Sequence, residues 1–92
     1  MSKITLKGFI IVPEDDIENV LSELPTHIEL TRKEHGCLVF SVTQDEHDIH
    51  KFNVYEEFKN IETFEHHKSR VSNSLWGQIT KNVERKYEII GA

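Results

Sequence analysis

The chain has 92 residues, of which 37% are hydrophobic and 29% charged, and its formal net charge is −5. This length predicts a single domain over residues 1–92, with a core thin enough to gain from oligomerisation. The negative charge and the lack of a basic stripe argue against binding to nucleic acid or to an anionic membrane surface. The single cysteine, Cys37, and the lack of a signal-like or membrane-spanning stretch predict a cytoplasmic protein.

The first third of the chain predicts a strand followed by a helix. Residues 3–12 are rich in Ile, Thr, Leu, Phe and Val, and this strand pattern ends at Pro13. Apolar residues at helical spacing then predict a helix up to about Arg32. Pro25 should kink this helix or split it into two, and Gly36 suits the turn that closes it.

The rest of the chain predicts two strands, a helix, a short helical turn and a last strand, over residues 37–43, 51–58, 60–72, 75–80 and 85–90. A polar connection, residues 44–48, joins the two strands. Asn60 can cap the helix that follows them. The order β-α-β-β-α-β is that of a ferredoxin-like α+β fold.

Both faces of the predicted sheet carry apolar side chains. In the first strand Ile4, Leu6 and Ile10 share one face. Phe9 and Ile11 share the other face. Two helices in this fold cover only one face, so the opposite face lacks an apolar cover within the monomer. We therefore expect a homodimer that packs sheet to sheet.

A carboxylate and an imidazole are predicted to point into one apolar interior. Strand alternation places Glu56 on the face of Phe52 and Phe58, and helical spacing places His67 on the face of Phe64. His67 is a candidate general base, because an ordinary pKa of about 6.5 suits proton removal at neutral pH. The alternative is a buried neutral histidine bonded to a backbone carbonyl. Glu56 is a candidate proton acceptor or, alternatively, the ion-pair partner of Arg70 or of a lysine of a second subunit.

Trp76 and Arg70 are further candidates for this pocket. Trp76 suits a wall that stacks against an aromatic substrate, and its alternative role is core packing. Arg70 can hold a phenolate or an oxyanion. The alternative for Arg70 is a surface ion pair with Glu62 or Glu65.

Asn53 and Tyr55 lie on the strand face opposite Glu56, so they line the pocket only if that face meets the helices. No metal site is expected. His66 and His67 are adjacent on a helix and point in different directions, and the histidines of the polar connection lack a third fixed ligand.

Four stretches carry a resemblance to a known family: EHGCLVF at residues 34–40, FNVYEEF at 52–58, FEHH at 64–67 and SLWGQIT at 74–80. In this order and spacing they resemble the antibiotic biosynthesis monooxygenase family, whose members are small dimeric α+β barrel proteins. The family's helix histidine falls on His67 and its strand glutamate on Glu56. Ser72 stands at about the place where many relatives carry a second histidine.

The resemblance implies an oxygenase without metal, flavin or other cofactor, acting on electron-rich phenols, hydroquinones or anthrones. His67 would deprotonate a small aromatic substrate held against Trp76, and the anion would pass an electron to O₂. Arg70 or Asn53 would stabilise the developing negative charge. Two other classes stay open: a small-molecule-binding dimer without turnover, and a cofactor-free isomerase of a small carbonyl metabolite.

Overall fold

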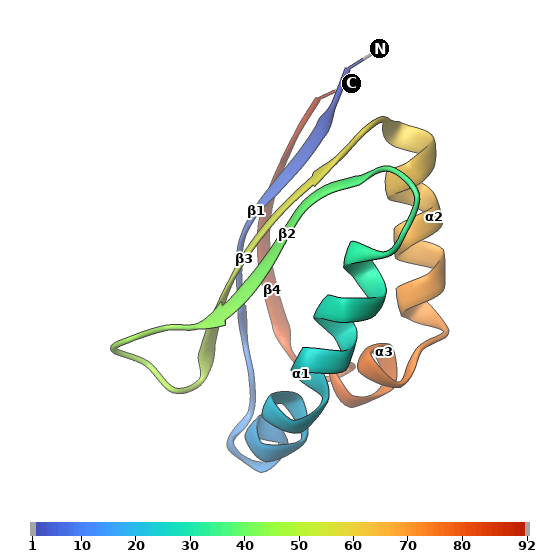
Figure 1. The fold of residues 1–92 in the computed structure, drawn as a ribbon. Helices are drawn as coiled ribbons and strands as arrows, with labels where there is room; N and C mark the ends of the chain where they lie inside the picture. Colours follow the sequence, from blue (N-terminus) through green and yellow to red (C-terminus); the bar gives the residue numbers. More distant parts are fainter. Residues whose placement is uncertain (1, 92) are drawn as a thin grey trace.

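The computed structural model describes residues 2–91. The strands are β1 (Ile4–Ile11), β2 (Cys37–Gln44), β3 (Lys51–Phe58) and β4 (Glu84–Ile90). The helices are α1 (Ile17–Arg32), α2 (Ile61–Ser72) and α3 (Leu75–Ile79), and the 3-10 turn η1 (Glu14–Asp16) precedes α1. The strands form one antiparallel sheet in the order β2-β3-β1-β4. The helices all lie on one face of it (Figure 1), which confirms the ferredoxin-like α+β fold.

The sheet face toward the helices carries the core. Alternation along β1 buries Ile4, Leu6 and Ile10, as the sequence predicts. Along β3 the same alternation buries Phe52 and Phe58 completely. The face of β3 that carries these phenylalanines therefore meets the helices, and every second side chain of β3 points to the outer face.

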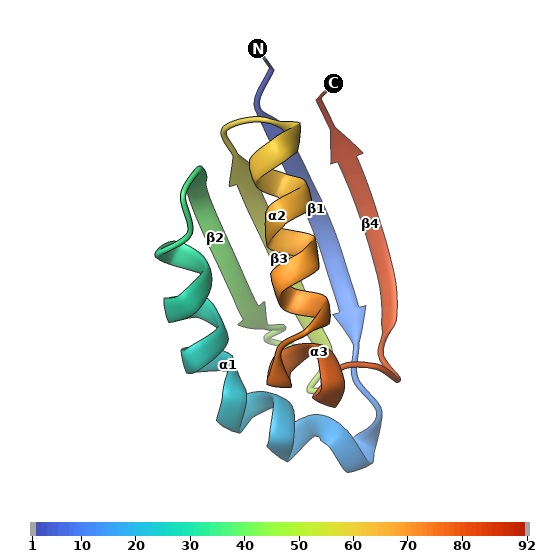
Figure 2. The same cartoon turned by 90° about the vertical axis from the view of Figure 1, so that its right-hand side faces the viewer.

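α1 continues through Pro25 as a single helix, so the alternative of two separate helices is wrong. Figure 2 shows that the first half of α1 runs across the end of the sheet and the second half runs along β2. Proline bends a helix because it lacks an N–H and its ring displaces the carbonyl of the preceding turn. The predicted kink thereby directs the second half of α1, with His27 and Thr31 buried on it, over the sheet.

The start of α2 is fixed by a capping box. The side chain of Asn60 accepts a hydrogen bond from the backbone N–H of Thr63 at 2.9 Å, and the hydroxyl of Thr63 accepts one from the backbone N–H of Asn60 at 3.3 Å. Gly36, with φ of 87°, packs against this box, and a Cβ there would lie 2.4 Å from the Thr63 methyl. These contacts join the turn before β2 to the start of α2.

The helices leave β4 and the outer face of the sheet uncovered. Figure 2 shows β4 beside the helices and not behind them. Tyr87 and Ile89 of β4 are 40% and 53% exposed, and Val39 and Tyr55 on the outer face are 39% and 38% exposed. Within residues 2–91, no helix is both long enough and apolar enough to cross a membrane.

Candidate functional site

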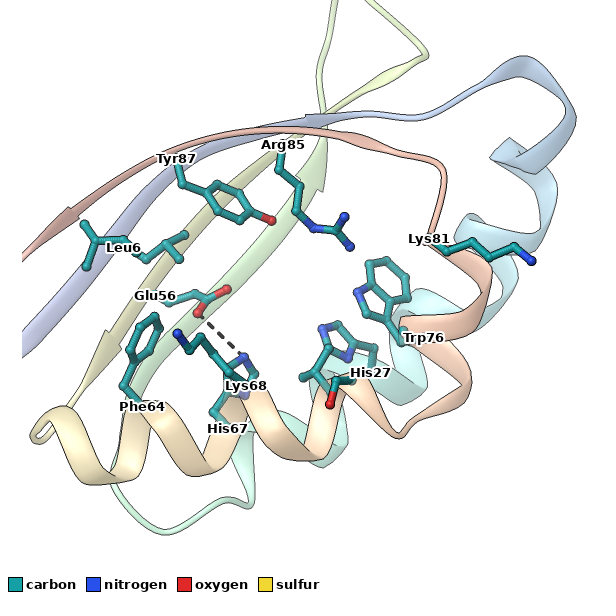
Figure 3. A pocket seen from close by; sticks show the side chains of 14 residues that line it. Leu6, His27, Glu56, Phe64, His67, Lys68, Trp76, Lys81, Arg85 and Tyr87 are labelled. Carbon is teal, nitrogen blue, oxygen red and sulfur yellow. Dashed lines mark ion pairs between the residues drawn. The ribbon is translucent and has the colours of Figure 1, made fainter.

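A cavity of about 490 Å³ lies between the helices and the helix-facing side of the sheet, and β4 forms one of its walls (Figure 3). This volume falls in the range of small-molecule sites. The ionisable and aromatic side chains considered below come from all three helices and from β3 and β4. They are His27, Glu56, His67, Trp76, Arg85 and Tyr87.

His67 is oriented by a buried carboxylate that sequence analysis did not single out. The side chain of Glu34 is 5% exposed, and its two oxygens each lie 3.1 Å from His67 Nδ1. Arg70 Nε donates to the same carboxylate, and Arg70 Nη2 donates to Thr31 Oγ1 at 2.9 Å. Because Glu34 acts as the acceptor, the proton of a neutral His67 lies on Nδ1. The lone pair on Nε2 then faces the cavity, where Glu56 Oε1 lies 3.7 Å away.

Glu56 presents an oxygen to this cavity that has no hydrogen-bond partner within residues 2–91. Its distance to His67 Nε2 is too long for a hydrogen bond, although Figure 3 shows the two groups pointing toward each other. Burial, and to a lesser degree the charge of Glu34, raises the pKa of Glu56 to about 7. Burial lowers the pKa of His67, and the Glu34 carboxylate opposes that shift. Near neutral pH the site therefore combines a neutral imidazole with a carboxyl group that titrates.

His27 is a second histidine in the cavity, and sequence analysis missed it. It is 4% exposed, its ring stacks on Trp76 with 4.4 Å between centroids, and it lies 6.5 Å from the ring of His67. In the described part of the chain its Nδ1 has no hydrogen-bond partner. Burial lowers the pKa of His27 to about 3, so it is neutral at physiological pH. Its position three residues after Leu24 on the apolar face of α1 was the signal that could have revealed it.

The structure brings Glu56, His67 and Trp76 together in the cavity wall. Arg70 lies outside the residues that line this cavity and points to Glu34 instead. That contact replaces both partners expected for Arg70, which were Glu56 and a surface glutamate of its own helix.

Asn53 and Tyr55 lie on the outer face of the sheet, because the Glu56 face of β3 is the one that meets the helices. Asn53 Nδ2 donates to Asp45 Oδ1 at 3.0 Å, and the Tyr55 hydroxyl donates to Glu57. The sheet therefore separates both side chains from the cavity.

Arg85 and Tyr87 of β4 also line the cavity, and sequence analysis did not single them out. Their two-residue spacing in a strand was a signal that they share a face. Burial raises the pKa of Tyr87, and the nearby Arg85 opposes that shift. No group of three or more His, Cys, Asp or Glu side chains that could hold a metal ion occurs within residues 2–91.

The sequence model of the antibiotic biosynthesis monooxygenase family matches residues 4–72, which is more than half of the chain. The chain belongs to this family. The matched part of this family member runs from β1 to the end of α2 and contains Glu34, Glu56 and His67. No significant match to it was found among curated proteins.

Solved structures resemble this family member over its whole length. A Bacteroides thetaiotaomicron protein of unknown function, described as a possible oxidoreductase, is 22% identical with a TM-score of 0.81, and the alignment covers 99% of this chain and 98% of that one. A candidate antibiotic biosynthesis monooxygenase from Nitrosomonas europaea is 22% identical with a TM-score of 0.80, and the alignment covers 100% and 98%. At this identity the likeness shows the fold.

Proposed function

We propose that this chain is a small cofactor-independent monooxygenase that oxidises a phenol, a hydroquinone or an anthrone with O₂. The observation that carries the proposal is the buried Glu34–His67 pair, which turns Nε2 of the imidazole toward a cavity beside Glu56. A carboxylate that fixes the tautomer of a histidine and stabilises its protonated form is a recurrent arrangement for a general base. Membership of the family supports the oxygenase class.

The first step is removal of a proton from the substrate by His67 Nε2. The Glu34 carboxylate stabilises the imidazolium that forms, and Arg70 acts as a positioning residue because it holds Glu34. Trp76, stacked on His27, offers a flat wall for the substrate ring.

The substrate anion then reduces O₂ by one electron, which gives a substrate radical and superoxide. The two combine into a peroxide at a carbon that still carries hydrogen, and loss of water leaves a carbonyl. One oxygen atom ends in the product and the other in water, so the substrate supplies all the electrons. The His67 imidazolium returns its proton to the peroxide anion. Glu56, with a pKa of about 7, is protonated often enough near neutral pH to donate the proton that the leaving hydroxide needs, and its carboxylate then takes up the proton that the carbon loses.

The test is oxygen uptake by metal-free, flavin-free protein with a panel of hydroquinones and anthrones, using ¹⁸O-labelled O₂. We expect one O₂ consumed per product and one labelled atom in each product molecule. His67→Ala should lower the rate by about a hundredfold or more, because a general base contributes at least that much. His66→Ala is the matched control, since His66 is the exposed neighbour on α2.

The other outcomes point to other functions. Hydrogen peroxide with no label in the product indicates an oxidase. Oxygen uptake that is unchanged in His67→Ala supports the oxygenase function and excludes His67 as the general base. Turnover without O₂ favours the isomerase, and saturable binding without any product favours a binding protein.

A further inference from the structure

Arg85 is a cation in the cavity wall with no carboxylate partner among residues 2–91. Its Nη2 donates to the carbonyl and the hydroxyl of Thr80, at 3.2 and 3.3 Å. Figure 3 shows its guanidinium turned from β4 toward the cavity, near Trp76. A guanidinium carries five N–H donors, so most of its donors remain free for a ligand.

Two lysines accompany Arg85 in the lining of the cavity. Lys68 pairs with Glu65 at 3.1 Å, whereas Lys81 has no carboxylate partner within the described residues. The Thr80 hydroxyl donates to the Trp76 carbonyl at 2.6 Å, so Thr80 ties Arg85 to the end of α3, directly before Lys81. In a chain of net charge −5, cations without acidic partners at one cavity point to an anionic ligand.

A buried polar atom without a partner supports this reading independently. His27 is one of the residues that line the same cavity, and its Nδ1 is buried and has no hydrogen-bond partner in the described part of the chain. Leaving such a group unpaired makes the folded state less stable. A ligand whose polar group reaches His27 and Arg85 recovers this energy, and a neutral imidazole with its proton on Nδ1 can donate to an anion.

We propose that the substrate is a hydroxylated aromatic carboxylic acid. Its carboxylate binds to Arg85, with Lys81 and His27 nearby, while its ring lies against Trp76 and its hydroxyl group reaches His67. A guanidinium fork matches the planar geometry of a carboxylate with two parallel hydrogen bonds. This inference rests on the proposed function, and it assigns to Arg85 the role of a specificity-determining residue.

The experiment compares the binding of 2,5-dihydroxybenzoate with that of its methyl ester, by calorimetry under argon so that no oxidation occurs. We expect the acid to bind at least about tenfold more tightly than the ester, a typical gain for one charge-assisted pair. Arg85→Met should remove this preference by weakening the binding of the acid more than that of the ester, and Arg85→Lys should keep part of it. Lys59→Met is the matched control, because Lys59 is exposed and lies outside the cavity lining.

Equal affinities for acid and ester overturn the proposal, and so does an acid preference that survives in folded Arg85→Met. Circular dichroism of each variant separates loss of binding from loss of fold. Oxygen uptake with uncharged hydroquinones, combined with equal affinities for acid and ester, supports the oxygenase function and excludes the carboxylate site. A preference for the acid that depends on Arg85, combined with no oxygen uptake for any compound, supports the carboxylate site and argues against the oxygenase function.

Discussion

Glu56 shows how one buried side chain links the proposed chemistry to stability. It sits on a strand face otherwise made of apolar groups, and one of its oxygens lacks a partner within residues 2–91. An ionised carboxylate in this position is disfavoured by burial, so the fold favours its protonated form. Burial therefore keeps on Glu56 the proton that the proposed reaction uses. It also makes the folded state less stable when that proton is lost.

Replacing Glu56 with Gln should change how stability depends on pH. The pKa is about 7 in the fold and 4.5 as the ordinary value, so between these values the unfolded chain releases a proton that the folded chain keeps. The free energy of unfolding contributed by Glu56 therefore falls as pH rises through this window, by about 3 kcal/mol in total. Relative to wild type, Glu56→Gln should become more stable from pH 5 to pH 8, by about 2–3 kcal/mol in urea unfolding.

Glu62→Gln is the control, because Glu62 is an exposed carboxylate on α2. Its stability relative to wild type should stay nearly constant over the same pH range. A flat difference for Glu56→Gln as well would mean that Glu56 has an ordinary pKa, and the assignment of Glu56 as proton donor would fail with it.

α2 is the element that places His67, and its position depends on how it begins. The capping box of Asn60 and Thr63 satisfies backbone N–H groups at the start of the helix, and Gly36 closes the turn packed on it. The same turn follows Glu34 in the chain. The cap of α2 and the Glu34–His67 contact therefore stabilise the same arrangement of α1, β2 and α2.

Asn60→Ala should lower the free energy of unfolding by about 1 kcal/mol, the usual cost of losing an N-cap side chain. The measurement is urea unfolding followed by circular dichroism. Asn82→Ala, at an exposed asparagine between α3 and β4, is the control and should change stability little. If the free energy of unfolding falls by the same amount in both variants, the Asn60 cap adds no more stability than an exposed asparagine does. The contacts of Glu34 and Gly36 alone would then position α2.

At the scale of the whole molecule, the outer face of the sheet is a surface that the helices leave open (Figure 1). Val39 and Tyr55 on this face stay more than a third exposed. Lys51 covers the ring of Phe9 there, with its Nζ 4.5 Å from the ring centroid. We propose that a second copy of the chain covers this face, since two sheets pack well through apolar residues of this kind.

Light scattering at micromolar concentration should therefore give about twice the chain mass of 10.8 kDa. Val39→Glu should shift this mass toward that of a monomer, because it places a charge in the proposed interface. Leu30→Glu is the matched control: Leu30 is a 46% exposed apolar residue on α1, on the helix side of the molecule. A monomeric mass for the wild-type chain would remove the dimer.

The sequence by itself determined the elements of this protein and which side chains share a face. Periods of two and 3.6 residues mark strands and helices wherever one side is buried, and those periods placed Glu56 on the face of Phe52 and Phe58 and His67 on the face of Phe64. Cap and turn residues such as Asn60 and Gly36 mark element ends, because their chemistry is local. The order of the elements then left few topologies open, and the ferredoxin-like one is confirmed.

Only the tertiary structure decided which groups meet. Both faces of β3 carry aromatic residues, so alternation could not say that Glu56 faces the helices and Tyr55 faces away. Glu34 reaches His67 from 33 positions earlier in the chain, and Arg85 enters the cavity from β4. The physical reason is that periodicity records which side of an element is buried, whereas the partner of a buried polar group depends on the packing of elements distant in the chain.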